Sequence, residues 1–237
     1  MSSRPAAGGG RWVDVAPERL AGWVDGFAQR HGAIETSWSP DVVRVVAADG
    51  AMAELQVPFP PLSASPSTDP AGPPNGGSSD LITRFVAHAA KDRLVAVLLV
   101  RRGGYAAGVF QGGGLVASKV GSRHVQGRSA AGGWSQQRFA RRRAGQATVA
   151  MAAAADVAAT LLLPYAGQLD GLVLGGDRAS VAAVLEDPRL APLRSLPLGR
   201  HLDVPDPRLV VLQRAAAQFR AVRIRVVDVE GEGQTAR

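Results

Sequence analysis

Residues 126–143 change abruptly from a segment that fits no regular element to a helix rich in arginine. Within residues 127–133 no apolar residue recurs with the period of a helix or a strand, and the glycines permit backbone conformations closed to other residues. From about residue 135 to about residue 163 the pattern is helical, which predicts roughly 28 residues and some 40 Å of helix. This stretch therefore predicts a flexible polar loop followed directly by a long basic helix.

Basic side chains are concentrated around this stretch. The formal net charge of the 237-residue chain is +7, yet residues 93–155 contain no Asp or Glu. A field of one sign concentrated on one region favours a polyanionic partner such as nucleic acid. The alternative is a basic face that is merely solvated. The basic residues of the span are Arg93, Arg101, Arg102, Lys119, Arg123, Arg128, Arg138, Arg141, Arg142 and Arg143.

The first part of the chain predicts a small α+β unit over residues 1–57. Residues 1–10 are rich in Gly, Ala, Ser and Pro and are expected to be disordered. A helix is expected over residues 15–30, and strands over residues 42–47 and 52–57. Residues 58–79 are rich in Pro, Ser and Gly and predict a linker, which makes them the expected domain boundary.

Residues 80–230 predict a second domain, with a polar tail at residues 231–237. Glycine turns separate three apolar runs, which predicts a meander of three strands. Helices and strands then alternate, and Asp177 is expected to cap a short helix. The predicted fold class is α/β, with a mixed sheet and flanking helices. The expected strands are residues 93–100, 105–111, 115–120, 169–174 and 222–229, and the expected helices after the long one are residues 178–185 and 207–219.

Composition narrows the possible chemistry. The chain has no cysteine, which excludes disulfides, thiolate nucleophiles and cysteine-ligated zinc. Its histidines lack metal-ligand spacing, so no metal and no cofactor are expected. Residues 149–163 form an apolar run that is too short to span a membrane, and the N-terminus lacks the apolar region of a signal peptide. A cytoplasmic protein without a membrane partner is therefore expected.

The predicted loop offers hydrogen-bonding side chains instead of titratable ones. Gln126 lies in it, and Ser135, Gln136 and Gln137 follow its glycines. A glutamine cannot titrate, but it donates and accepts hydrogen bonds at once. It can therefore position a water against an ester carbonyl or stabilise the developing oxyanion. The alternative is that Gln136 and Gln137 are ordinary polar residues in the first turn of a helix.

A family resemblance rests on the sequence Gly132-Gly133-Trp134-Ser135-Gln136-Gln137-Arg138-Phe139-Ala140-Arg141. It resembles the Gly-Gly-Gln loop and following helix of the eukaryotic/archaeal class I peptide release factors, which read Gly-Gly-Gln-Ser-Ala-Leu-Arg-Phe-Ala-Arg. Residues 108–112 and 169–176 resemble neighbouring strands of the same domain, and the similarity covers residues 94–229. It implies an RNase H-like mixed sheet with a long basic helix after the catalytic loop.

One departure from that motif changes the expected site. Trp134 stands where those factors have their catalytic glutamine. The serine–glutamine pair that follows is similar to the Gly-Gly-Ser-Gln loop of ribosome-quality-control release factors, and the chain most resembles an actinobacterial branch of these Vms1-like factors. This implies a peptidyl-tRNA hydrolase that acts on stalled large ribosomal subunits, with peptidyl-tRNA and rRNA as partners. Gln136 is then the first catalytic candidate, followed by Gln137 and Gln126.

The remaining candidates have supporting roles. Arg138, Arg141 and Arg142 share one helix face and suit phosphate, and Trp134 can stack on a base. Two other functions stay open: a non-catalytic ribosome- or RNA-binding protein on the same scaffold and, less favoured, a nuclease, which needs clustered carboxylates. The expected RNA-binding residues are Arg123, Arg128, Arg138, Arg141, Arg142, Arg143 and Trp134, and the expected loop residues are Gly127, Gly132, Gly133 and Ser135.

Overall fold

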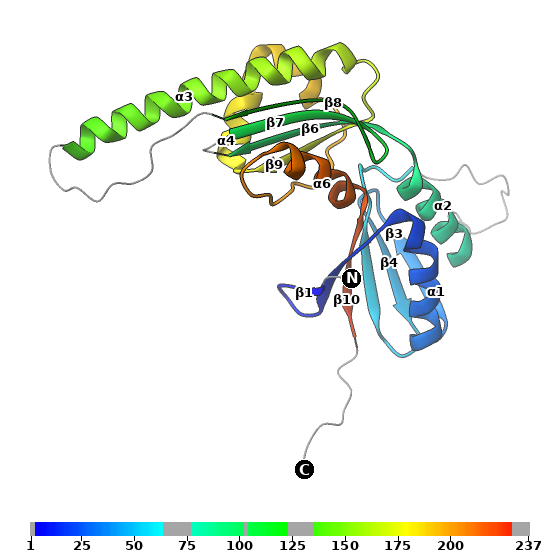
Figure 1. The fold of residues 1–237 in the computed structure, drawn as a ribbon. Helices are drawn as coiled ribbons and strands as arrows, with labels where there is room; N and C mark the ends of the chain where they lie inside the picture. Colours follow the sequence, from blue (N-terminus) through cyan, green and yellow to red (C-terminus); the bar gives the residue numbers. More distant parts are fainter. Residues whose placement is uncertain (1–2, 64–76, 102–103, 123–134, 229–237) are drawn as a thin grey trace. The chain divides into compact units, whose positions relative to one another are not determined.

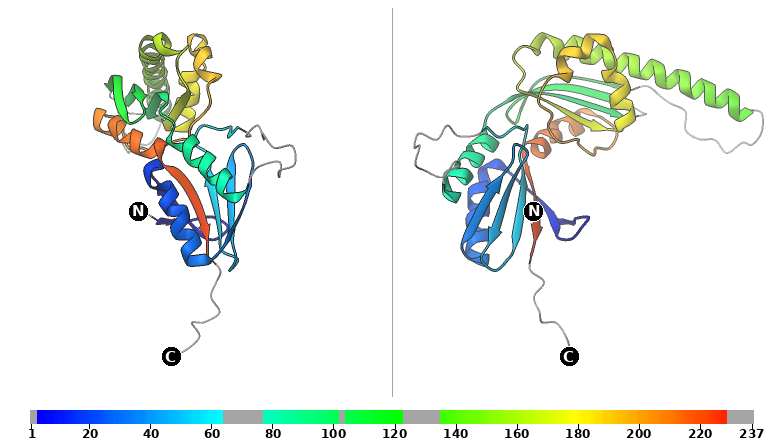
Figure 2. Two further views of the ribbon diagram at one scale, coloured as in Figure 1. Left: turned by 90° about the vertical axis from the view of Figure 1, so that its right-hand side faces the viewer. Right: turned by 180° about the vertical axis from the view of Figure 1, so that it is seen from behind.

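The computed structural model describes residues 3–63, 77–101, 104–122 and 135–228, with only the backbone for residues 135–147. The chain forms two compact units (Figures 1 and 2). Unit 1 comprises residues 1–91 and 220–237, and unit 2 comprises residues 92–219.

Unit 1 is built on a six-stranded sheet with strand order β1-β2-β10-β5-β4-β3, in which every pair is antiparallel. Two helices, α1 (Leu20–His31) and α2 (Ser78–Ala90), pack on it, and a short 3-10 turn, η1 (Pro17–Arg19), precedes α1 (Figure 1). The strands are β1 (Ser3–Pro5), β2 (Arg11–Val15), β3 (Ile34–Trp38), β4 (Val42–Ala47), β5 (Met52–Gln56) and β10 (Val222–Val227).

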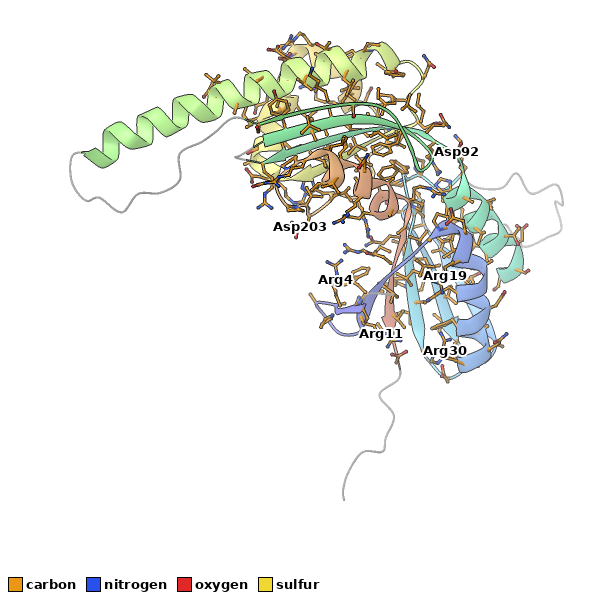
Figure 3. All side chains as sticks on the ribbon, viewed as in Figure 1. Arg4, Arg11, Arg19, Arg30, Asp92 and Asp203 are labelled. Atoms are coloured by element: carbon orange, nitrogen blue, oxygen red, sulfur yellow. The ribbon has the colours of Figure 1, made fainter. Side chains whose placement is uncertain are left out.

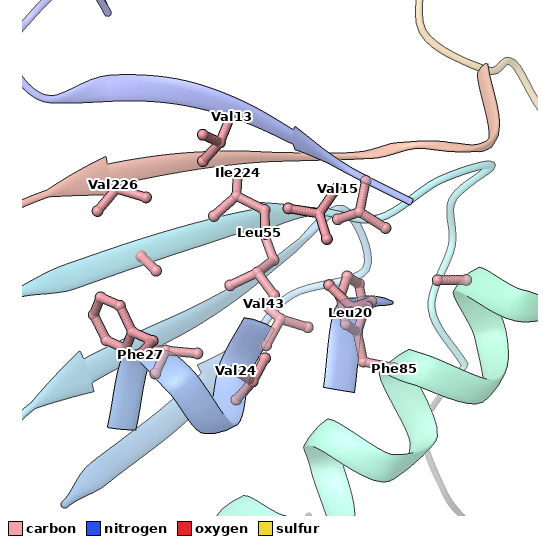
Figure 4. Packing of buried hydrophobic residues seen from close by; sticks show 14 of the residues in the cluster. Val13, Val15, Leu20, Val24, Phe27, Val43, Leu55, Phe85, Ile224 and Val226 are labelled. Carbon is pink, nitrogen blue, oxygen red and sulfur yellow. The ribbon is translucent and has the colours of Figure 1, made fainter. Parts of the chain in front are cut away.

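The core of unit 1 follows from two apolar periods in the sequence. Every second residue of the central strands faces the helices, and the cross-strand row Val13, Ile224, Leu55 and Val43 is buried (Figure 4). The helices bury apolar residues that recur with the helical period, and Phe85 of α2 is one of them. The opposite face carries the cross-strand charged pairs Asp14 with Arg223 and Glu54 with Arg225.

Residues 3–10 are ordered, contrary to the expected disorder of residues 1–10, and residues 1 and 2 lie outside the described residues. Arg4 of β1 pairs with Trp12 of β2, and Figure 3 shows Arg4 and Arg11 on this hairpin. The Arg225 guanidinium donates hydrogen bonds to the carbonyls of Gly8, at 2.6 Å, and Gly9, at 3.1 Å. These glycines have positive φ angles, so the low-complexity sequence is a turn that β10 holds in place.

The compact units also divide the chain differently from the expected domains. The segment expected as a linker begins by packing on unit 1, because Phe59 and Leu62 are 7% and 3% exposed. Residues 64–76 lie outside the described residues. Helix α2 belongs to unit 1, and so does β10, which inserts between β2 and β5. The composition of a segment does not show that β10, near the C-terminus, pairs with strands from the N-terminal part of the chain.

Unit 2 contains the predicted mixed sheet, with strand order β8-β7-β6-β9. The antiparallel meander of β6 (Leu94–Arg101), β7 (Gly104–Gln111) and β8 (Gly114–Ser122) is confirmed, and β9 (Gly171–Gly176) pairs with β6 in parallel. Two isolated parallel bridges, Leu172 with Leu198 and Gly175 with Leu202, lie beside β9. The α/β fold class is confirmed.

Helices cover both faces of this sheet. Residues of α3 (Ser135–Leu162) and α4 (Arg178–Leu185) share a buried cluster with alternate residues of β6 and β7. The opposite face meets α6 (Leu209–Arg220), where the Phe110 and Phe219 rings meet edge to face at 5.5 Å. The Asp177 side chain caps α4, as predicted, by accepting a hydrogen bond from Ser180 N. The remaining elements are η2 (Leu163–Tyr165), η3 (Pro188–Leu190) and α5 (Ala191–Arg194).

Helix α3 has the predicted length of 28 residues. Its second half packs on the sheet through Ala150, Ala154, Ala158 and Leu162, which are spaced by four residues and buried. The window Thr148–Tyr165 is long and apolar enough to cross a membrane, and it is the single such window in the described parts of the chain. This window is longer than the run recognised in the sequence. Within this window Ala150, Ala154, Ala158 and Leu162 pack against the sheet, and 33% of the window is buried.

Candidate functional site

The candidate site lies where β8 leads into α3. β8 ends at Ser122 and α3 begins at Ser135, so the loop predicted from the glycines joins these two elements. Several predicted residues lie outside the described residues: Arg123, Gln126, Gly127, Arg128, Gly132, Gly133 and Trp134. The structure therefore defines the two ends of the loop, and the roles of these residues remain predictions.

The first turn of α3 contains the predicted residues Ser135, Gln136 and Gln137. The first four N–H groups of a helix have no partner within the helix, and this end carries partial positive charge. Figure 1 shows that the first part of α3 extends beyond the edge of the sheet. The start of the helix thus presents hydrogen-bond donors at the end of the loop.

The predicted phosphate-binding arginines follow within the next two turns. Arg138, Arg141 and Arg142 lie in continuous α-helix, so their spacing of three and four residues places them on one face of the backbone. Arg143 is the next residue of the same helix. No acidic residue precedes Asp156 in α3, which leaves this half of the helix uniformly cationic.

Two other arginines of the basic span have structural roles. Arg93 is 7% exposed, and burial lowers the pKa of its guanidinium, although the charge of Asp170 opposes this. Arg101 donates a hydrogen bond from Nη1 to the Val204 carbonyl at 2.7 Å. Lys119 of β8, in contrast, is exposed. The basic span therefore contains both buried and exposed cations. The number of basic residues in the sequence does not tell which of them are exposed.

Residues 169–176, which resemble a strand of the release-factor domain, end in β9 at Gly176. Gly176 there has a φ of +93°, and a Cβ would collide with the Val100 carbonyl, so only glycine fits. Its N–H donates to the Leu202 carbonyl at 2.9 Å, and His201 Nε2 lies 3.0 Å from its carbonyl oxygen. Because these backbone groups have partners within the protein, this end of the sheet has a structural role.

The described parts of the chain contain no group of three or more His, Cys, Asp or Glu that could hold an ion. His31 lies 2.8 Å from Asp49 through Nδ1, and His88 lies 2.8 Å from the Pro58 carbonyl through Nε2. These two histidines have structural roles in unit 1. His124 lies outside the described residues.

A charged network holds α3 to the segment after α4. Arg189 contacts Asp156 of α3 and Asp187, each at 2.7 Å. The Arg189 side chain, followed by its backbone N–H, lowers the pKa of Asp187 to about 2 from an ordinary value of 3.8. A carboxylate whose pKa is lowered by folding stabilises the folded state fully at any pH above its pKa in the unfolded chain. This stabilisation is lost as the pH falls to its pKa in the folded protein.

We expect Arg189→Ala to lower the melting temperature at pH 7 by a few degrees at most, because the network is exposed to solvent. The difference from the parent should shrink as the pH falls from about 4 to about 2, where Asp187 becomes protonated in both proteins. Thermal unfolding across this pH range measures it, with Arg178→Ala as a control for charge. A difference that is unchanged at pH 2 would contradict the assignment.

With the site's geometry established, comparison with known families identifies the chain's relatives. The family model described as "Actinobacteria/chloroflexi VLRF1 release factor" matches residues 93–225, which is more than half of the 237 residues. The chain belongs to this VLRF1 release-factor family. The matched region runs from the residue before β6 into β10, and it therefore contains β8, the loop and α3.

Solved structures add distant likenesses. The Vms1 mitochondrial localization core is similar over 81% of this chain and 77% of its own, with 8% identity and a TM-score of 0.39. The archaeal translation termination factor aRF1 is similar over 86% of this chain, with 17% identity and a TM-score of 0.36, and the match spans 56% of that factor. Dom34 of S. cerevisiae shows 9% identity over 93% of this chain and 69% of its own, with a TM-score of 0.32. No curated protein matches the chain in sequence.

Proposed function

We propose that this member of the VLRF1 family is a ribosome-associated peptidyl-tRNA hydrolase that frees nascent chains from stalled large ribosomal subunits. The observation that carries the proposal is the family match, because it spans the β8–loop–α3 region. The cationic first half of α3, which suits RNA phosphate, supports it as well. The residues between Gly127 and Gly133 are mostly small, so this part of the loop can enter a narrow space lined with RNA.

The chemistry proposed for the loop is water attack on an ester. The oxygen of a water bonds to the carbonyl carbon of the peptidyl ester, the bond to the tRNA ribose oxygen breaks, and that oxygen receives a proton. A glutamine orients the water and donates a hydrogen bond to the developing oxyanion. Gln136 is the first candidate for this role, and Gln137 and Gln126 are the alternatives.

The arginines hold the RNA that presents this ester. Arg138, Arg141 and Arg142 lie on one face of α3, within two turns of Gln136, so phosphates bound there place the tRNA end near the loop. Arg123, Arg128 and Arg143 extend the same cationic surface, and Trp134 stacks on a nucleotide. Binding energy gained from the RNA then serves to orient the reacting ester.

The test is single-turnover release from purified large ribosomal subunits that carry peptidyl-tRNA with a labelled peptide. We expect the parent chain to release the peptide and leave deacylated tRNA, which gel electrophoresis separates from peptidyl-tRNA. Co-sedimentation in the same reactions measures binding to the subunit. Salt-sensitive binding without release would refute the hydrolase and favour a non-catalytic RNA-binding protein on the same scaffold.

A further inference from the structure

The last paired residues of β8 before the loop form an unusually close contact with β7. In the antiparallel register Gly104 lies opposite Ser122, and Tyr105 lies opposite Gly121. A Cβ built on Gly121 would lie less than 3.0 Å from three atoms of the Tyr105 side chain, namely Cζ, the hydroxyl oxygen and Cε2. The Tyr105 ring therefore lies directly over the Gly121 backbone, in the space that the side chain of any other residue at position 121 would occupy.

This contact lies at a vulnerable point of the sheet. β8 is the edge strand of the unit 2 sheet, so within it β8 pairs only with β7. The end of an edge strand frays easily, because few interactions hold its backbone in place. An aromatic ring that covers a cross-strand glycine adds contact at the paired residues where a fraying end would separate first.

The ring also connects this strand end to α3. Tyr105 is partly buried and packs against a cluster that includes Ala154, Ala158 and Leu162 of α3. β8 leads into the loop, and α3 receives the chain after it. Tyr105 thus contacts the strand at one end of the loop and packs against the cluster that anchors the helix at the other end. Movement of either end would change where the loop is presented.

We propose that Tyr105 is a positioning residue for the loop, and that Gly121 is glycine because the Tyr105 ring must lie over it. This inference rests on the proposed hydrolase function. Tyr105 does not touch the reacting groups; it fixes the point at which β8 releases the chain into the loop. A displacement of about 1 Å at a catalytic group can cost about 100-fold in rate, so the anchoring of the loop bears directly on the reaction.

The test compares four variants in single-turnover release. We expect Tyr105→Ala and Gly121→Ala each to lower the rate constant at saturation at least about 10-fold, with binding to the subunit changed by less than about 3-fold. The double variant should be no slower than the worse single variant, because both changes remove one contact. Tyr105→Phe should restore the parent rate, since the ring provides the packing.

Tyr165→Ala is the matched control. Tyr165 is the other of the two tyrosines, and it also is partly buried against the same cluster, but it lies in η2 beyond the far end of α3. It should lose comparable thermal stability while its release stays within about 3-fold of the parent. Release by Tyr105→Ala at the parent rate would overturn the proposal. An equal loss of release in Tyr165→Ala would overturn it as well.

Hydrogen exchange of the β8 amides separates this inference from the proposed function. Residues 114–122 should exchange faster in Tyr105→Ala and Gly121→Ala than in the parent or in Tyr165→Ala. If the parent chain releases no peptide but the exchange differs as expected, the hydrolase proposal fails and the contact still holds the strand end. Unchanged exchange in both variants would overturn the role of Tyr105 whatever the release assay shows.

Discussion

Gln136→Ala should lower the single-turnover rate constant for peptide release by roughly 100- to 1,000-fold, the usual loss when one donor to an oxyanion is removed. Binding to the ribosomal subunit should change little, because the side chain acts on the transition state. A glutamine has no titratable proton, so the release step should show no ionisation attributable to this residue between pH 6 and pH 8. Rapid quenching of labelled subunits measures the rate constant.

Gln137→Ala and Gln126→Ala establish which glutamine acts. Gln136 and Gln137 are consecutive in α3, and consecutive helical residues point about 100° apart at 3.6 residues per turn. If one glutamine acts, one alanine variant should lose at least about 100-fold in rate and the other less than about 10-fold. A large loss confined to Gln126→Ala would move the catalytic group to the start of the loop.

The control for these variants is Gln146→Ala. Gln146 lies in the same helix, ten residues after Gln136, or about 15 Å along the axis. Its replacement removes the same chemical group from α3 at a distance from the loop, so release should stay near the parent rate. If Gln126, Gln136 and Gln137 can all be replaced without loss of release, the ester must be hydrolysed without a glutamine from the loop or the first turn of α3.

Local patterns predicted the elements that carry the site. The meander, the 28-residue helix and the Asp177 cap depend on short-range signals, namely apolar runs, glycine turns, helical period and a capping side chain. Each of these acts within a few residues, where sequence and conformation are closely linked. The motif from Gly132 to Arg141 then placed the expected chemistry at the junction of two elements whose existence the structure confirms.

Long-range pairing was not predictable in the same way. β10 alternates valine and isoleucine with arginine, which indicates a strand with one buried face but does not say which sheet receives it. Its partners are β2 and β5, about 210 and 170 residues away in sequence by its register. The Tyr105–Gly121 contact was not predictable for the same reason. A glycine in a strand indicates that another group approaches its backbone closely. The cross-strand register is needed to show that this group is the Tyr105 ring.

Replacing Arg138, Arg141 and Arg142 together with glutamine should weaken binding to the ribosomal subunit by about 100-fold at physiological salt. The three residues lie on one face of α3 and have no acidic neighbour among the helix residues before Asp156, so RNA phosphate is the natural counter-charge. Each lost phosphate contact lowers the slope of log K against log salt by about 0.7 to 0.9. The triple variant should therefore show a slope smaller by about 2 to 3.

The control removes the same charge elsewhere in unit 2. Arg178, Arg208 and Arg214 are exposed, and their joint replacement with glutamine also lowers the net charge by three. If α3 holds RNA at defined phosphates, this variant should keep the parent slope and bind within about 3-fold of the parent. Equal losses in the two triple variants would mean that total charge governs binding and α3 has no special part in it. Because glutamine is a good helix former, the replacements in α3, α4 and α6 should leave these helices intact, and the comparison isolates the effect of the guanidinium groups.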